Sequence, residues 1–248
     1  MAGVGLARRA LAEGVGTGLL VVAVVGSGIM AARLSPGNVG LELLENSIAT
    51  AFALAALILA FGPVSGAHFN PAVSLADWWL GRRHRTGLST PVLGVYVAAQ
   101  VAGGIGGSVL ANLMFGLPAV RFSTTTRAAG HLWLGEVVAT AGLLLLIFAL
   151  ARTGRTAAAP AAVGAYIGAA YWFTSSTSFA NPAVTIGRAF TDTFAGIAPG
   201  SVPGFVAAQL AGLVVGVALL AVLYPDAGRA ADNVVTAHGP AVDVDGRP

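Results

Sequence analysis

Six long apolar runs dominate the sequence. An α-helix needs about 20 consecutive apolar residues to cross the hydrocarbon core of a bilayer. Only 9% of the 248 residues are charged and 56% are apolar, so the chain has too few charges to cover a globule in water. We therefore predict an all-α integral membrane protein whose helices span residues 8–32, 43–62, 91–115, 131–152, 158–177 and 202–224.

The basic residues, all of them arginine, are shared unevenly between the connections. The N-terminus, the loop at 81–87 and the connection after the fourth run hold seven arginines, and the opposite connections hold four. Loops rich in arginine stay in the cytoplasm. We expect a multi-pass protein of the cell inner (plasma) membrane with both termini cytoplasmic. The first run is too long for the apolar core of a signal peptide, so we interpret it as a span.

A repeated pattern divides the chain into two halves. Because each half holds three predicted spans, the second half enters the membrane from the opposite side, which makes an inverted 3+3 repeat. Such repeats place a substrate path at their interface, near the bilayer midplane. In both halves an intramembrane Glu precedes Asn-Pro-Ala-Val and then Ala-Ala-Gln; the matching residues are Glu13, Asn70, Pro71, Ala72 and Gln100, and Glu136, Asn181, Pro182, Ala183 and Gln209.

The segments at 70–80 and 181–191 are too short to span a bilayer. Each begins with Asn, a favoured helix N-cap, followed by Pro, which is favoured at the first helical position. We predict two half-helices that begin inside the membrane and meet head to head. Their N-termini create a positive potential that repels cations. The amides of Asn70 and Asn181 can donate hydrogen bonds to a passing neutral molecule.

These paired motifs resemble the aquaporin family, also called the major intrinsic proteins. The likeness rests on SGAHFNPAV at 65–73 and on the second Asn-Pro-Ala, and it covers about residues 8–224. It implies an aquaporin-like right-handed bundle of six transmembrane helices plus two re-entrant half-helices, with a pore in each protomer of a homotetramer. It also implies that Glu13, Glu136 and His68 brace the two pore loops, which agrees with the high cost of an unpartnered carboxylate in a membrane.

The family narrows its pore at a filter of four positions. Counted without gaps from the two Asn residues, the resemblance places them at Thr50, Ala169, Ser178 and Val184. Family members nearly always carry Arg at the last position, and strict water channels add a bulky aromatic residue and a His. We expect a wider ring here, with two hydroxyls and no fixed charge. A slip of one residue in the fifth span would replace Ala169 with Gly168 or Ala170.

One arginine lies close to the filter in sequence. Arg188 follows Val184 by four residues, so both share a face of the half-helix, with Arg188 about 6 Å further out. Three interpretations stay open: a guard of the outer vestibule, a solvated arginine at the loop end, or a partner of Asp192. Trp172 and Phe173 fit packing or interfacial roles better than filter roles.

The expected filter suits small neutral solutes. Thr185 stands where glycerol channels usually carry Asp, and the stretch TDTFAGI at 191–197 resembles bacterial arsenic-associated aquaglyceroporins. We expect a passive channel for water, glycerol-like polyols and arsenite or methylated arsenicals. The alternative is an ordinary water or glycerol facilitator with no metalloid role.

Other classes fit the sequence less well. A coupled secondary transporter needs carboxylates in the path, whereas Glu13 and Glu136 are better explained as braces. An intramembrane enzyme needs a Ser–His dyad, paired Asp residues or metal-ligand spacing in the spans, and we find none. A non-conducting structural protein would give no osmotic water flux. We expect no cofactor, metal site or nucleic-acid partner, only small neutral solutes and the lipid bilayer.

The chain is expected to form one channel domain. It covers residues 1–225, with the first repeat at about 8–115 and the second at about 131–224. Residues 226–248 are polar and rich in Asp and Gly, so we predict a disordered cytoplasmic tail.

Overall fold

The computed structural model describes residues 4–229, and this range is helical without strands. The predicted tail beyond Arg229 lies outside the described residues. Three short 3₁₀ turns, η1 to η3, cover Thr156–Ala158, Arg188–Phe190 and Pro199–Ser201. The α-helices are α1 (Leu6–Leu34), α2 (Val39–Ser65), α3 (Pro71–Gly81), α4 (Thr90–Met114), α5 (Gly130–Arg152), α6 (Ala159–Phe173), α7 (Pro182–Gly187) and α8 (Val202–Leu223).

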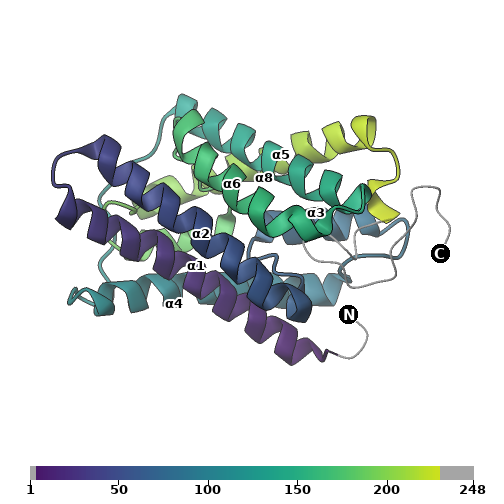
Figure 1. Cartoon of the computed structure of the whole chain (residues 1–248), viewed down its shortest axis with the longest axis horizontal. Coiled ribbons are helices and arrows are strands. Elements are labelled where there is room, and N and C mark those ends of the chain that lie inside the picture. Colours follow the sequence, from purple (N-terminus) through teal and green to yellow (C-terminus); the bar gives the residue numbers. More distant parts are fainter. Residues whose placement is uncertain (1–3, 230–248) are drawn as a thin grey trace.

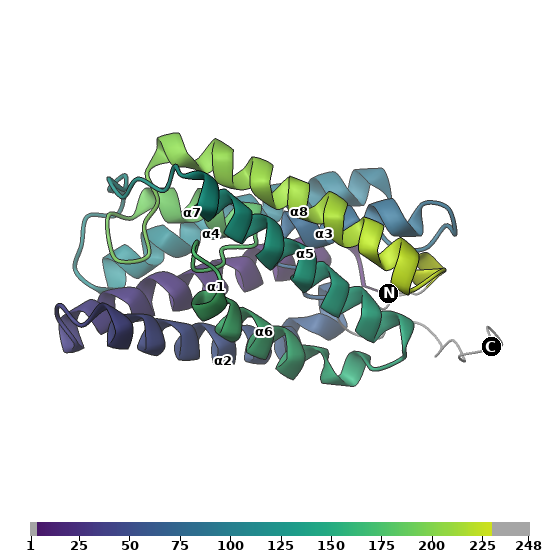
Figure 2. The ribbon, with the colours of Figure 1, turned by 90° about the horizontal axis from the view of Figure 1, so that it is seen from above.

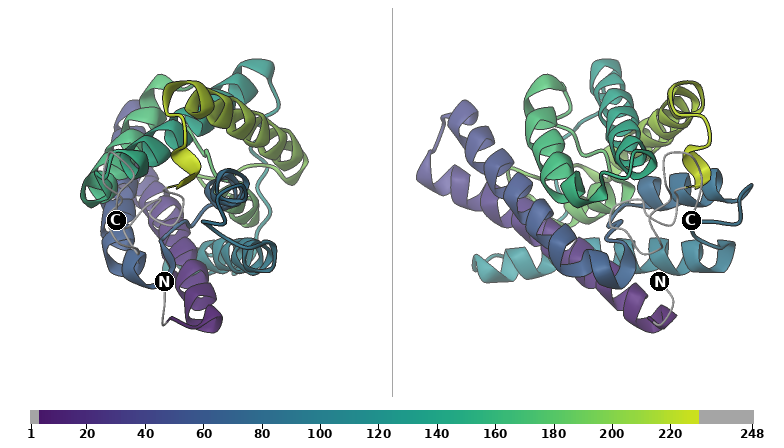
Figure 3. Two further views of the ribbon diagram at one scale, coloured as in Figure 1. Left: turned by 90° about the vertical axis from the view of Figure 1, so that its right-hand side faces the viewer. Right: turned by 45° about the vertical axis from the view of Figure 1, so that its right-hand side comes forward.

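The long helices run side by side along the long axis of the molecule (Figure 1). The start of α1 and the end of α8 lie at the same end, which we call the terminal end; the turn between α1 and α2 lies at the far end (Figures 1 and 2). Viewed along the bundle from the terminal end, the helices surround the short helix α3 (Figure 3). Within residues 4–229, five helices are long and apolar enough to cross a membrane: α1, α2, α4, α5 and α8 with the preceding turn η3.

The fifth predicted span is shorter than expected. Helix α6 has 15 residues and ends at Phe173, whereas the apolar run predicted a helix over 158–177. At about 1.5 Å per residue such a helix is about 22 Å long, less than the hydrocarbon thickness. The chain leaves the helix at Thr174, where it turns extended, and residues 174–181 form the re-entrant loop that leads to α7.

The two halves pack through equivalent helix pairs. Helix α1 packs along α4, and α5 packs along α8. The first pair approaches closely through glycines, because a Cβ atom at Gly103 would lie 2.0 Å from the carbonyl oxygen of Gly14. The second pair has the same feature, since a Cβ atom at Gly212 would lie 2.7 Å from the Val137 oxygen. Close backbone approach at small residues is typical of helix packing in membranes.

Each half-helix packs against a long helix of the other half. Helix α7 contacts α4, and α3 contacts α8. The first contact includes a hydrogen bond of 2.7 Å from the Ser108 hydroxyl to the Gly187 carbonyl. In the bundle α3 lies towards the terminal end and α7 towards the far end (Figure 2). Their N-termini therefore face each other in the middle of the molecule.

Candidate functional site

The two half-helices begin with the caps that the sequence predicts. The Asn70 side-chain oxygen accepts a hydrogen bond from the Ala72 N–H at 2.9 Å. The Asn181 oxygen accepts from the N–H groups of Ala183 and Val184 at 3.0 and 3.2 Å. The first helical residues are Pro71 and Pro182, which have no N–H to satisfy.

The amide nitrogens of the same two asparagines cross to the opposite loop. Asn70 Nδ2 donates to the Ala180 carbonyl at 2.7 Å, and Asn181 Nδ2 donates to the Phe69 carbonyl at 2.8 Å. Each amide carries two N–H groups, so this reciprocal pair uses one from each. The bonds fix the two re-entrant loops to each other, and both asparagines line a central cavity.

Glu13 holds the first re-entrant loop from helix α1. Its Oε1 accepts from the Ser65 hydroxyl at 2.6 Å and from the His68 N–H at 3.0 Å. Its Oε2 accepts from the Phe69 N–H at 2.7 Å and from the Gln100 amide at 2.8 Å. The carboxylate is fully buried, and these four donors offset its desolvation.

Glu136 holds the second loop from helix α5 in the same way. Its oxygens accept from the N–H groups of Phe179 and Ala180, both at 2.8 Å, and from the Gln209 amide at 2.6 Å. Gln209 also donates to the Thr185 hydroxyl of α7 at 2.8 Å. The glutamine therefore links the brace to the half-helix.

The equivalent glutamine in the first half does the same. Gln100 donates to the Ser74 hydroxyl of α3 at 3.0 Å, and His68 Nδ1 lies 3.1 Å from the same hydroxyl. In the sequence analysis Gln100 and Gln209 served only to mark the repeat, and their hydrogen bonds to the half-helices were not predicted. The signal that could have revealed it is the recurrence of Gln at the same place in both halves.

Both loops hold non-glycine residues in the left-handed region. Ala67 and Phe69 have φ of 49° and 50°, and Ser178 and Ala180 have φ of 47° and 48°. Such conformations cost on the order of 1–3 kcal/mol each and persist where the surroundings enforce them. Here the N–H groups fixed by Glu13 and Glu136 belong to the same loops. The strain and the braces thus occur together in both halves.

The cavity between these loops has a volume of about 50 Å³ and has two kinds of wall. Its polar wall carries side chains of both loops and their neighbours: Thr50, His68, Asn70, Tyr171, Ser178, Asn181 and Arg188. Its apolar wall comes from α1, α2, α5, α6 and the half-helices: Leu20, Val24, Leu54, Ile58, Val73, Leu143, Ile147, Val163, Ile167 and Val184.

Three of the four predicted filter residues line this cavity, and the fourth does not. Thr50, Ser178 and Val184 are lining residues, whereas Ala169 is exposed on the outside of the bundle. On α6 the lining residues recur every four positions and end with Tyr171, which lies about 200° around the helix from Ala169. The ungapped register was therefore wrong by two residues, more than the slip to Gly168 or Ala170 that we considered.

Tyr171 changes the chemistry of the ring. Its hydroxyl lies 3.1 Å from the Thr50 hydroxyl, and both side chains are buried. The expectation of small residues throughout was wrong, because an aromatic side chain with a polar tip occupies the α6 position. Trp172 and Phe173, which follow it, are both exposed and outside the cavity lining.

Arg188 also belongs to the cavity wall. Only 3% of its surface is exposed, and its guanidinium carbon lies 3.4 Å from the centre of the Phe179 ring. Its Nε donates to the Ala195 carbonyl. Arg188 adds a charge to the cavity wall outside the four predicted filter positions, and the interpretation of Arg188 as a solvated residue was wrong. Asp192 pairs with Arg121 instead, at 3.3 Å.

Comparison with known proteins identifies the family. A family model described as "Major intrinsic protein" matches residues 1–178, well over half of the chain. The chain belongs to the major intrinsic protein family. The residues matched include α1 to α6 and the first half of the repeat, with its cap and brace.

Individual relatives agree with this assignment. The chain is 53% identical to aquaglyceroporin AqpS of Rhizobium meliloti (strain 1021) over 215 residues, 87% of this chain and 89% of that protein. It is 30% identical to the probable aquaporin AqpM of Archaeoglobus fulgidus over 77% of this chain and 86% of that one. The fold is similar to the X-ray structure of the aquaglyceroporin from Plasmodium falciparum, with a TM-score of 0.62, 21% identity and 89% and 96% of the two chains covered.

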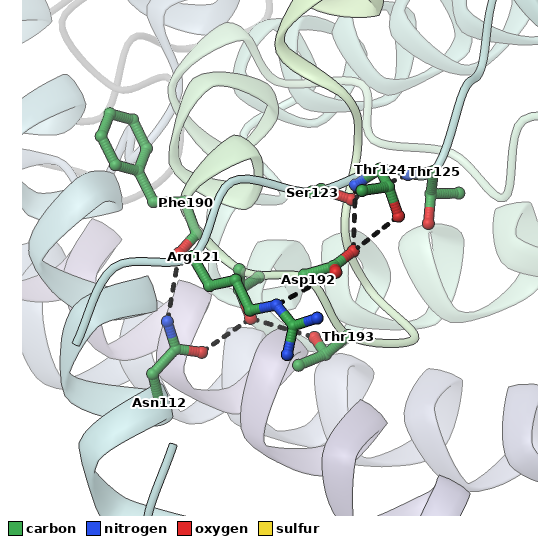
Figure 4. Close-up of polar contacts among 9 residues, drawn as sticks. Asn112, Arg121, Ser123, Thr124, Thr125, Phe190, Asp192 and Thr193 are labelled. Carbon is green, nitrogen blue, oxygen red and sulfur yellow. Dashed lines mark hydrogen bonds and ion pairs between the residues drawn. The ribbon is translucent and has the colours of Figure 1, made fainter. Parts of the chain in front are cut away.

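At the far end of this major intrinsic protein, the connection after α4 packs over the segment after α7 (Figure 4). Asp192 Oδ1 accepts from the N–H and hydroxyl of Thr124 at 2.9 and 3.0 Å, and these bonds hold the pKa of its carboxyl below the usual value. The Asn112 amide donates to the Phe190 carbonyl at 3.1 Å, and its oxygen accepts from Thr191 at 2.7 Å. These contacts fix the chain that carries Arg188 and its acceptor.

Proposed function

We propose that this protein is a passive transmembrane channel for small uncharged solutes. The observation that carries the proposal is one central cavity whose lining includes both capping asparagines, residues on either side of them, and many apolar side chains. A polar neutral molecule in such a passage exchanges its hydration for fixed hydrogen-bonding groups. Both half-helix N-termini meet there, and their partial positive charges disfavour cations.

Glycerol-like polyols and neutral trihydroxy acids such as arsenous acid fit the two walls. Such solutes present hydroxyls on one side and carbon or a central atom on the other. Ser178 supports the proposal, because the residue lines the cavity and its buried hydroxyl has no hydrogen-bond partner among the described residues. Val184, where the family carries Arg, leaves the ring wider on its side than a guanidinium would.

The relatives support the polyol class. The name of the Rhizobium meliloti protein describes an aquaglyceroporin, and this chain spans most of its length. Permeation by arsenite or methylated arsenicals rests on the resemblance of NPAV in the second motif and of the stretch at 191–197 to the arsenic-associated subgroup. The second candidate is an ordinary water or glycerol facilitator, and the hydroxyl pair of Thr50 and Tyr171 is consistent with either.

A coupled transporter has less support than a channel. It would need a carboxylate in the path, but Glu13 and Glu136 are each held by three or more donors and neither lines the cavity. Solute flux that follows an imposed pH gradient would favour that class over a passive channel.

The test is a stopped-flow panel in proteoliposomes with water, glycerol, urea and arsenite. We expect glycerol and arsenite to enter faster than through empty lipid, in either direction. Glycerol flux without arsenite flux would leave the polyol channel and reject the metalloid role. Water flux alone would indicate a water facilitator, and no flux of any solute would reject the channel.

Three further properties are proposed with the channel. Residues 1–225 form one channel domain, both termini face the cytoplasm, and four copies assemble. Apolar grooves on the outside of the bundle, between α1 and α4 and between α2 and α6, support the assembly because small residues there admit close packing. Native mass spectrometry of the purified protein is expected to give a tetramer.

A further inference from the structure

Arg188 has hydrogen-bonding capacity that the protein itself does not use. A guanidinium carries five N–H donors, and here only Nε has an acceptor, the Ala195 carbonyl. Among the described residues no acceptor lies within hydrogen-bonding distance of the two terminal nitrogens. They are also not sealed from solvent, since the cavity wall includes Arg188. Four N–H donors are therefore available to a molecule in the cavity.

The surroundings of Arg188 hold it in place. Its guanidinium stacks on the Phe179 ring, and the Arg127 guanidinium lies 5.2 Å from the centre of the same ring. Arg127 does not line the cavity, and its Nε donates to the Gly196 carbonyl at 3.1 Å. A guanidinium fixed by stacking and by one hydrogen bond loses little freedom when it binds a solute.

Arg188 lies one helical turn from the position that usually carries the family's arginine. Residues four apart share a face of a helix, so Val184 and Arg188 both reach the cavity from α7 and the turn that follows. The turn shifts the charge about 6 Å towards the far end. The same wall carries Ser178, whose hydroxyl has no partner among the described residues.

We propose that Arg188 and the Ser178 hydroxyl form a solute-binding position on the far side of Val184. It takes the oxygen atoms of neutral polyhydroxy solutes and excludes cations before they reach the ring of Thr50 and Tyr171. The inference rests on the proposed channel function and deepens it. The guanidinium that is absent at Val184 is then supplied from Arg188, and the space beside Val184 admits a larger solute.

The test compares glycerol permeability, water permeability and cation leak in proteoliposomes. Arg188→Gln removes the charge and most donors, so we expect glycerol permeability to fall about tenfold while water permeability stays within about twofold. We also expect a measurable K⁺ or proton leak. Arg188→Lys keeps the charge but lacks the planar fork, so it should lower glycerol permeability without a leak. Arg121→Gln is the control, because it removes one charge from an exposed residue at the same end.

The outcomes separate this inference from the channel proposal. A wild-type protein that does not conduct glycerol rejects the channel for polyols. A wild-type protein that conducts glycerol, with an unchanged glycerol-to-water ratio and no leak in Arg188→Gln, rejects the role of Arg188 alone. If Arg188→Gln does not fold, the ratio in Arg188→Lys decides, and an unchanged ratio there also overturns the proposal. An equal change in Arg121→Gln would show a nonspecific effect of charge and would overturn it too.

Discussion

Glu136 has no exposed surface and three N–H groups aimed at its carboxylate. Two of the three come from the backbone of the re-entrant loop, at residues Phe179 and Ala180. An N–H that loses its acceptor inside a membrane finds no water to replace it. The carboxylate therefore does more than neutralise a dipole: it fixes two consecutive peptide units in the orientation that the cavity wall needs.

Replacing this carboxylate by an amide tests that role. In Glu136→Gln one acceptor oxygen becomes an NH₂ group facing an N–H donor, whichever way the amide is turned. We expect the free energy of unfolding to fall by about 3 kcal/mol, measured in detergent by thermal or denaturant unfolding. The control is Glu45→Gln, whose carboxylate accepts one hydrogen bond, from Ser35 at 2.8 Å, and should cost less than about 1 kcal/mol. Equal losses would contradict the bracing role.

Val184 offers a second test at the level of one residue. Val184→Arg restores the family residue in the cavity that Thr50 and Tyr171 also line. The longer side chain narrows the ring, so we expect glycerol and arsenite permeability to fall at least about tenfold while water permeability remains. Permeabilities are measured by stopped-flow light scattering. A parallel loss of water flux would indicate a misfolded protein, and unchanged glycerol flux would place the narrowest point elsewhere.

At this scale the sequence predicted the capping asparagines and the two braces but misplaced part of the ring. Asn70, Asn181, Glu13 and Glu136 have local or repeated signatures that do not depend on loop length. The α6 position depends on where the helix ends, and the prediction of a span to residue 177 passed over the Ser/Thr run at 174–178, which is a loop signal directly after the end of α6. Arg188 depends on the loop fold that brings the Ala195 carbonyl to it, which no local pattern encodes.

Among the elements, the seam between α1 and α4 sets how closely the first half packs. Gly14 and Gly18 of α1 face Gly103 and Gly107 of α4, four residues apart on both helices. A Cβ atom at Gly107 would lie 2.3 Å from the Gly18 carbonyl oxygen. Lipid tails contact apolar side chains as favourably as another helix does. The two helices therefore associate through the van der Waals contacts that their backbones make where glycines allow a close approach. The position of α1 in turn sets the position of Glu13.

A single methyl group should open this seam. We expect Gly103→Ala to destabilise the protein by about 2 kcal/mol or more, because its Cβ would overlap the Gly14 oxygen and the helices must separate. Thermal unfolding in detergent measures the shift. Gly94→Ala on the same helix has nothing within 4 Å and should be neutral or stabilising by up to about 1 kcal/mol. The seam would be unimportant if both variants melted alike.

The half-helices show which elements a sequence can specify. In an apolar stretch, Asn followed by Pro predicts the start of α3 and α7, because Asn is favoured as a helix N-cap and Pro at the first helical position. The ends are less determined. The second half-helix was predicted over 181–191, but α7 ends at Gly187 and continues as a 3₁₀ turn over Arg188–Phe190. The hydrogen bonds of this turn to the connection after α4 come from tertiary packing.

For the whole molecule, the inverted repeat makes a topological prediction. If α1 and α8 begin and end in the cytoplasm, the loop at 82–87 faces the cytoplasm and the connection at 115–129 faces the outside. The protein has no cysteine, so single cysteines report location without a background. We expect an impermeant maleimide to label Thr126→Cys in intact cells and to leave Arg83→Cys unlabelled until the membrane is opened. Both positions are exposed, so a reversed pattern would reverse the topology.

The fold as a whole was the most predictable property. The apolar runs gave the long helices, and the order of Glu, Asn-Pro-Ala and Gln gave the pairing of the halves, which the equivalent helix pairs confirm. The family model and the structural similarity confirm the resulting architecture. The proposed assembly of four copies was less predictable, because an apolar side chain on the outer surface can face either lipid or a neighbouring copy.

Asn70 is synthesised 110 residues before Ala180, so its side-chain amide has no carbonyl acceptor in the second loop until Ala180 has been made. By then the four long helices α1, α2, α4 and α5 can already be inserted, and the first re-entrant loop has the brace from Glu13, the contacts of Gln100 and its own cap. Ala180 and Asn181 are adjacent in the chain, so both hydrogen bonds between the loops can form together: Asn70 to the Ala180 carbonyl and Asn181 to the Phe69 carbonyl. A chain cut off by arrested translation before Ala180 therefore lacks the join between the loops, and the passage is closed off from the lipid only in the last stage of synthesis.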